Sequence, residues 1–224
     1  MSEVRRAVAG GNARDIREAV TSVEIETALQ QVGSGLLKAY RTADRPEREP
    51  LSPVLISVSQ HLQLRGWVGD DILASEMLAE LRGEQQNSRP LRIDLDELSS
   101  TMADHGEYPS GYLNTQTGQV VPAVLTDEYA VGDEEAVDVE GGNWVYLVDD
   151  SQQGWQDMAD FAAEVEDPRI REILEEAVHG KGAFSRFRSA VHRADLGAEW
   201  YCFADDRRWG RARQELAELG LRSV

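Results

Sequence analysis

The sequence predicts an α+β protein, with a helical N-terminal region over residues 1–87 followed by a domain over residues 88–224. In that domain, a small antiparallel sheet is expected to pack with C-terminal helices. Apolar residues recur at helical spacing in much of the first region and again near the C-terminus. Between them, two β-rich runs flank a Thr-Gln-Thr-Gly turn, the pattern of a hairpin. At 224 residues, 41% of them apolar, the chain can bury a core.

The first helix is predicted over residues 13–32, with Asn12 as its cap. Gly33 and Gly35 are expected to interrupt it before a further turn begins. Residues 42–53 are rich in charge and proline, and are expected to form a linker or loop.

Two further helices are expected to form a hairpin. One begins at Ser52-Pro53 and runs to residue 65, and Asp70 is expected to cap the other, over residues 71–82. The hairpin has the outline of a DNA-reading helix-turn-helix. Its last helix carries four acidic residues against one arginine, however, which argues against DNA reading.

The second region opens after a polar joint at residues 83–90. A short strand and a helix are predicted over residues 91–102, with Asp94 or Asp96 as the cap. A hairpin with strands near residues 108–114 and 119–125 follows, in which Pro122 indicates an edge strand.

Seven acidic residues and no basic one lie in residues 127–140, which are expected to form a loop or edge connection. A strand over residues 143–149 follows. The remaining helices are predicted over residues 152–165, 168–180 (capped by Asp167), 183–194, 196–209 and 210–220, with Gly220 ending the last.

The run HGKGAFSRFRSA (residues 179–190) has no acidic residue, in a chain of formal charge −18. A helix over residues 183–194 places Phe184 and Phe187 on an apolar arc, opposite a basic or neutral arc. In one interpretation, Gly180 closes the preceding helix and both phenylalanines enter the core. The arginines are then solvated or pair with carboxylates such as those of the acidic segment. In the other interpretation, the N-terminus of the helix and its cations hold an anion. The candidate anion- or partner-binding residues are Lys181, Gly182, Arg186, Arg188, His192 and Arg193.

Three stretches resemble a bacterial group, uncharacterised protein family 0158, over about residues 91–221. They are IDLDEL with GYLNTQTGQVV, HGKGAFSRFR and EWYCFADDR. The chain departs from the family pattern at Asn114, Ser185 and Arg188, where aspartate, arginine and lysine are expected. The resemblance implies an α+β domain, and it brings no established activity, cofactor or catalytic residue.

No motif for a cofactor, a metal or catalysis is recognised. The glycines around Lys181 lack the spacing of a Walker A loop and of a dinucleotide fingerprint. His105-Gly106-Glu107 offers two metal ligands where zinc needs three or four. Cys202 is the single cysteine and is expected to be buried among aromatic residues. Trp200, Phe203 and Trp209 are expected to form a core cluster rather than a base-stacking platform.

No apolar run approaches the 18 residues that a membrane span needs, and the first 20 residues lack a secretory signal pattern, so a cytoplasmic protein is expected. The leading hypothesis is a non-enzymatic interaction or regulatory protein that binds another protein through acidic and helical surfaces. One version of it is an acidic protein that occupies a DNA-binding surface of its partner. The alternatives are nucleic-acid or nucleotide binding through the basic helix, and an enzyme of unknown type. The sequence leaves the oligomeric state open.

Overall fold

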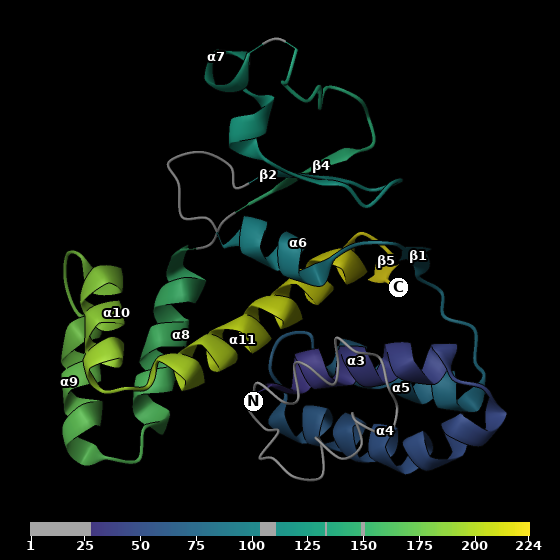
Figure 1. Cartoon of the computed structure of the whole chain (residues 1–224), viewed down its shortest axis with the longest axis horizontal. Helices are drawn as coiled ribbons and strands as arrows, with labels where there is room; N and C mark the ends of the chain where they lie inside the picture. The colour runs from purple at the N-terminus through teal and green to yellow at the C-terminus, as the bar shows by residue number, and fades with distance from the viewer. Residues whose placement is uncertain (1–27, 104–110, 133, 149–150) are drawn as a thin grey trace.

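The computed structural model describes residues 28–103, 111–132, 134–148 and 151–224. It confirms the α+β fold class, because an N-terminal group of helices is followed by a small three-stranded antiparallel sheet and then by C-terminal helices, with a separate two-stranded sheet (Figure 1). Most of the first predicted helix, with its cap Asn12, lies outside the described residues.

Three helices form the N-terminal group: α3 (Leu29–Thr42), α4 (Arg45–Arg65) and α5 (Asp70–Arg82). The predicted hairpin of α4 and α5 is confirmed, but the predicted interruption at Gly33 and Gly35 is wrong. A Cβ at Gly33 would lie 2.8 Å from Leu73 Cδ2, so this glycine permits a close contact between α3 and α5.

The predicted loop at residues 42–53 is also wrong over most of its length, because α4 already begins at Arg45. Pro46 lies in the first turn of α4, where a backbone N–H would have no helical partner, so its missing N–H costs nothing. Pro50 and Pro53 lie further inside, where each disfavours the helix by about 3 kcal/mol relative to alanine. Each aliphatic side chain that α4 buries contributes about 2 kcal/mol to the stability of the fold, which offsets that cost. The residues buried along this face are Leu51, Leu55, Val58 and Leu62.

The start of α5 differs from the prediction as well. Gly69 (φ 81°) precedes the helix, and Asp70 is its first residue rather than its cap. The carboxylate of Asp70 points back and accepts a hydrogen bond from the N–H of Trp67 at 2.9 Å. It therefore secures the turn between α4 and α5.

After this group the chain forms β1 (Arg89–Leu91) and α6 (Leu95–Met102). Of the two expected caps, Asp94 is confirmed, because its Oδ1 accepts the N–H of Asp96 at 2.8 Å. β1 pairs in parallel with a C-terminal strand that the sequence did not predict, β5 (Leu221–Ser223).

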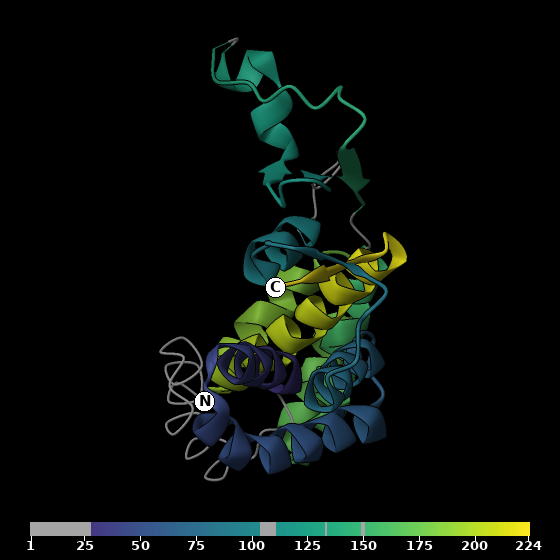
Figure 2. The same cartoon turned by 90° about the vertical axis from the view of Figure 1, so that its right-hand side faces the viewer.

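The antiparallel sheet consists of β2 (Gly111–Asn114), β3 (Val120–Pro122) and β4 (Trp144–Leu147), in the order β3-β2-β4. The predicted hairpin, and the edge position of the strand with Pro122, are confirmed. Buried residues of the three strands join a core cluster with α6 and the end of α11. Figure 2 shows the sheet between α6 and the outlying segment that connects β3 to β4.

That connection, residues 123–143, is called the acidic arm below. It contains the 3₁₀ helix η2 (Ala123–Thr126) in place of the end of the strand predicted over residues 119–125, so that part of the strand prediction is wrong. It also contains the four-residue helix α7 (Glu128–Val131), so the loop expected over residues 127–140 is helical in part. The arm stands away from the remaining helices (Figures 1 and 2).

The C-terminal part begins with α8 (Ser151–Glu164), α9 (Pro168–Val178) and α10 (Ala183–Arg193). The predicted cap of α9 is confirmed, because Asp167 Oδ1 accepts the N–H of Arg169 at 2.8 Å. The two last predicted helices are one continuous helix, α11 (Gly197–Glu218), and Gly220 follows its end with φ 69°.

α11 joins all three core clusters of the described residues. It contributes Cys202 to the cluster of α3–α5, Phe203 to that of α8–α10, and Leu216 to that of α6 and the sheet. The predicted boundary at residue 87 lies between α5 and β1, and α11 packs against helices on both sides of it.

Candidate functional site

The predicted anion site lies at the junction of α9 and α10. Gly180 and Gly182 both have φ 80°, and Gly182 is the N-cap of α10. The sequence predicted that these two glycines separate two helices, and this is confirmed.

The guanidinium of Arg186 folds back over this junction. It donates hydrogen bonds to the carbonyl oxygens of His179, Gly180 and Lys181. These carbonyls lie beyond the end of α9 and have no partner within a helix. Arg186 thus satisfies backbone acceptors of its own chain. Arg193 acts similarly within α10, where its Nε donates to the carbonyl of Ser189 at 3.3 Å.

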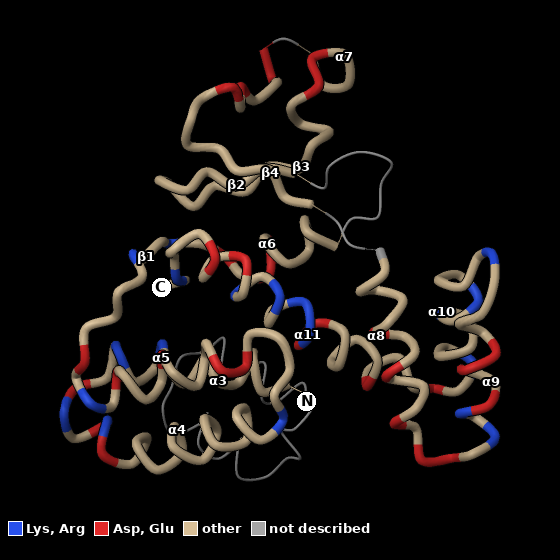
Figure 3. The backbone as a smooth tube through the Cα atoms, turned by 180° about the vertical axis from the view of Figure 1, so that it is seen from behind, with Lys and Arg blue, Asp and Glu red and all other residues tan. Residues whose placement is uncertain are grey.

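The basic arc of α10 does not face the acidic arm. The two lie in different parts of the molecule (Figure 3), and among the described residues no ion pair joins them. The hypothesis that the chain's own acidic segment covers the basic helix is therefore not supported.

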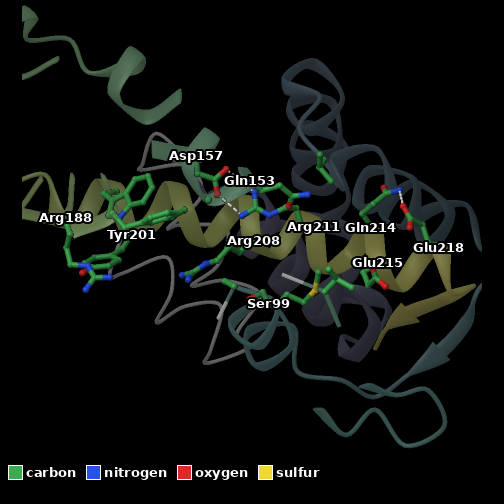
Figure 4. A pocket seen from close by; sticks show the side chains of 18 residues that line it. Ser99, Gln153, Asp157, Arg188, Tyr201, Arg208, Arg211, Gln214, Glu215 and Glu218 are labelled. Carbon is green, nitrogen blue, oxygen red and sulfur yellow. Dashed lines mark hydrogen bonds and ion pairs between the residues drawn. The ribbon is translucent and has the colours of Figure 1, made fainter. Parts of the chain in front are cut away.

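Of the six predicted residues, only Arg188 lines a groove of about 460 Å³ along α11. The groove lies between α6, α8, α10 and α11. Three aromatic side chains line it together with Arg188, namely Phe184, Trp200 and Tyr201, and Figure 4 shows Tyr201 at the end of the groove where Arg188 lies. Lys181, Gly182, Arg186, His192 and Arg193 lie outside it.

The expectation that both phenylalanines of α10 enter the core is half right. Phe187 is 1% exposed and packs against Phe161 and Trp200, whereas Phe184 is 38% exposed. Phe184 lies in the first turn of α10 and contributes to the groove wall. Trp200 and Phe203 belong to the same cluster as Phe187, but Trp209 packs in the cluster of α6 and the sheet.

An ion-pair network lies beside the groove. Arg211 holds Asp157 with two hydrogen bonds, of 3.0 Å and 2.7 Å, and Arg207 Nε contacts the same carboxylate at 2.7 Å. Asp157 is only 3% exposed, so these two cations stabilise a buried charge that ties α8 to α11. At the far end of the groove, burial and the nearby Glu218 raise the pKa of Glu215.

A second cleft, of about 860 Å³, lies between α3, α6 and the β2–β3 turn. Lys38 and Arg92 are exposed at its wall, and Glu76 and Arg213 also line it, 3.4 Å apart. Burial raises the pKa of Glu76 and lowers that of Arg213, while the attraction between the two opposes both shifts. Arg213 also donates to Ser34 Oγ at 2.6 Å, so this pair serves helix packing.

The acidic arm carries exposed charged and apolar side chains. Tyr129 in the arm is fully exposed, and Val124 and Leu125 are 58% and 40% exposed. Residues 123–143 contain no lysine or arginine. The carboxylates exposed in the described part of the arm are Asp127, Glu128, Glu134, Glu135, Asp138 and Glu140.

No group of three or more metal-ligating side chains occurs among the residues that the structure describes. His105 and Glu107, the metal-ligand pair considered from the sequence, lie outside those residues. Cys202 is 2% exposed, as expected.

No helix in the described part of the chain combines the length and apolar character that crossing a membrane requires. Comparison with protein-family models, with curated proteins and with solved structures gives no match. The resemblance to uncharacterised protein family 0158 therefore stays a prediction.

Proposed function

We propose that this chain is a non-enzymatic protein that binds a basic surface of a partner protein through its acidic arm. The observation that carries the proposal is the arm itself, which projects from the helices with six exposed carboxylates and no cation in its sequence. Its exposed Tyr129, Val124 and Leu125 add the apolar and aromatic area that protein interfaces use.

The distribution of arginines supports this proposal. The described ion pairs that involve buried carboxylates lie within the helices outside the arm, which are called the body here. Their cations are Arg65, Arg207, Arg211 and Arg213. These four arginines are thus engaged within the body, and among the described residues no ion pair joins a cation to a carboxylate of the arm. Such a field attracts a basic partner and speeds its association.

The test is affinity capture from lysate of the native host with the tagged full-length chain, washed at 0.1 M or 1 M salt. The Debye length falls from about 10 Å to about 3 Å between these concentrations, so an electrostatic complex is lost at 1 M. A variant with Glu128→Lys, Glu134→Lys and Glu135→Lys replaces three of the seven acidic residues of the arm by lysine, which removes nearly all of its net negative charge, and is expected to retain no partner.

The matched control changes the same number of exposed carboxylates on α9: Glu172→Lys, Glu175→Lys and Glu176→Lys. This control is expected to retain the partner. Equal loss in both variants points to net charge rather than the arm, and failure of the unchanged chain to retain any specific partner rejects the proposal.

A cytoplasmic location and membership of the bacterial family are part of this proposal. In one version of the proposal, the arm occupies a DNA-binding surface of the partner. That version predicts that DNA releases the partner from the captured complex, which electrophoresis of the eluate tests.

Arg188 favours a second candidate, the binding of a nucleotide. It is exposed in the groove near three aromatic side chains, and no ion pair engages it among the described residues. A cation beside aromatic rings suits a planar anionic ligand. Nucleotides, RNA and DNA should bind the unchanged chain and the Arg193→Glu control, but not Arg188→Glu. Arg186 is left intact because its substitution disturbs the α9–α10 junction. Equal binding by all three chains rejects this candidate.

A further inference from the structure

The hydrogen-bond pattern of the small sheet shows which way each backbone group of β4 points. Thr115 donates its N–H to the carbonyl of Asn143 at 2.8 Å, at the end of the β2–β4 ladder. Hydrogen-bonded and non-hydrogen-bonded pairs alternate in an antiparallel ladder. The pair Tyr112–Tyr146 is then non-hydrogen-bonded, and both backbone groups of Tyr146 point away from β2.

This outer edge of β4 has no strand beside it among the described residues, since the sheet order ends at β4. The outward N–H and carbonyl of Tyr146 have no hydrogen-bond partner in the described part of the chain. Natural edge strands are commonly protected by lysine, proline or a bulge. The opposite edge strand carries Pro122, but residues 143–148 have neither proline nor charge.

Aromatic and apolar side chains lie beside this edge. The rings of Tyr112 and Tyr146 meet edge to face, with centroids 5.7 Å apart. Tyr146 is 47% exposed and Val148, just beyond β4, is 67% exposed. A strand placed against β4 would therefore gain side-chain contacts as well as main-chain hydrogen bonds.

We propose that the outer edge of β4 binds an extended basic segment of the partner protein by strand addition. The inference rests on the proposed function and names its mode of binding. The arm runs directly into β4, and its carboxylates Asp138 and Glu140 precede Trp144 by a few residues. A strand beside β4 thus lies next to negative charge, which selects lysine and arginine in that strand.

Charge also argues against a second copy of this chain as the occupant. Two copies paired edge to edge along β4 would bring two acidic arms together, each without lysine or arginine. Like charges placed side by side oppose such pairing. The complementary occupant is therefore basic and extended.

The experiment measures fluorescence anisotropy of labelled eight-residue peptides with the full-length chain. The first peptide alternates lysine and valine. The second alternates lysine and proline, which keeps the charge but favours polyproline II and cannot form a full ladder. The third alternates glutamate and valine. The Lys-Val peptide should bind, the Lys-Pro peptide about tenfold or more weakly, and the Glu-Val peptide not at all.

Two variants at one position give an independent measurement. Tyr146→Pro removes the outward N–H and no hydrogen bond of the ladder with β2. It should weaken Lys-Val binding about tenfold, whereas Tyr146→Ala keeps the N–H and should weaken it less. Circular dichroism checks that each variant folds, and if Tyr146→Pro does not, the comparison of the three peptides decides alone.

The failures of the two proposals are distinguishable. Equal affinity for the Lys-Val and Lys-Pro peptides overturns strand addition and leaves charge-driven partner binding intact. No binding of the Lys-Val peptide, while the lysate capture still depends on the arm, also overturns strand addition alone. A dimer of the unchanged chain in sedimentation velocity that Tyr146→Pro abolishes assigns the edge to a second copy and overturns the inference.

Discussion

Arg65 and Asp206 form a buried ion pair, with Nη1 of the arginine 2.6 Å from Oδ2 of the aspartate. The same guanidinium holds both carboxylate oxygens of Asp70, at 2.9 Å and 2.7 Å, and lies over the ring of Trp67 at 4.0 Å. Asp206 also accepts the N–H of Gln30 at 2.7 Å. One arginine at the end of α4 thus links the start of α5 and the middle of α11, and Asp206 links α11 to the start of α3.

Removal of this arginine is predicted to destabilise the protein strongly. Asp70 and Asp206 are completely buried, so Arg65→Ala leaves two carboxylates without their cation. Breaking a buried pair in this way costs about 3–5 kcal/mol. Arg82→Ala is the control, because the pair of Arg82 with Glu84 is largely exposed and is worth less than about 1 kcal/mol. Urea unfolding of both variants measures the two changes, and similar values for them would contradict the prediction.

Stability should depend on pH through Asp206. Burial raises its pKa from 3.8 to about 6, although Arg65 opposes the shift. Since the folded pKa exceeds the unfolded one, the folded state binds more protons between these values. The contribution of this group to stability is full below about pH 4 and is lost as the pH rises through 6, by about 3 kcal/mol in total.

Asp206→Asn keeps a neutral side chain of the same shape and removes this titration. The difference in unfolding free energy between the unchanged chain and Asp206→Asn should shift between pH 4 and pH 7, with the unchanged chain losing stability relative to the variant as the pH rises. A constant difference over this range is the opposing result. Glu164 and Glu215, whose pKa values burial also raises, remain in both chains and cancel in the comparison.

Two glycines of α11 should respond in opposite ways to alanine. A Cβ at Gly210 would lie 2.1 Å from the carbonyl oxygen of Val68, whereas at Gly197 it would meet nothing within 4 Å. Gly210→Ala must move α11 away from the α4–α5 turn, at a cost of about 2 kcal/mol or more. Gly197→Ala should be neutral or stabilise by up to about 1 kcal/mol. Thermal unfolding of the two variants checks the contrast, and an unchanged midpoint for Gly210→Ala argues against the close packing.

The two phenylalanines of α10 should differ in their contribution to stability. Phe187 is 1% exposed, and Phe187→Ala should cost about 3–5 kcal/mol through lost burial and a cavity. Phe184 is 38% exposed, so Phe184→Ala should cost only about 1 kcal/mol. Urea midpoints for the pair provide the measurement, and equal costs would place both rings in the core.

Local signals in the sequence determined several elements correctly. Asp94 and Asp167 each precede a helix with a side chain that accepts early N–H groups, which depends on a few neighbouring residues only. The hairpin with Gly118 at φ 80° and the edge position of Pro122 have the same local origin. The candidate residues of α10 could be named from charge, but the direction of each side chain could not be predicted.

Long-range packing decided the remaining features. The sequence predicts that a helix is interrupted at Gly33 and that a new one begins at Gly210, whereas in the folded protein each glycine lies within a helix where a second segment approaches too closely for a Cβ. β5 is short and forms only because β1 lies beside it. Arg65 meets Asp206, 141 residues further along the chain, and no spacing rule predicts such a pair. The sequence by itself therefore determined the helix starts capped by Asp94 and Asp167, the β2–β3 turn and the acidic character of the arm, because these depend on near neighbours. Only the tertiary structure decided which charges are buried together and that no described strand lies along the outer edge of β4, because both depend on how segments distant in sequence are placed side by side. It also decided that Arg186 turns toward its own backbone.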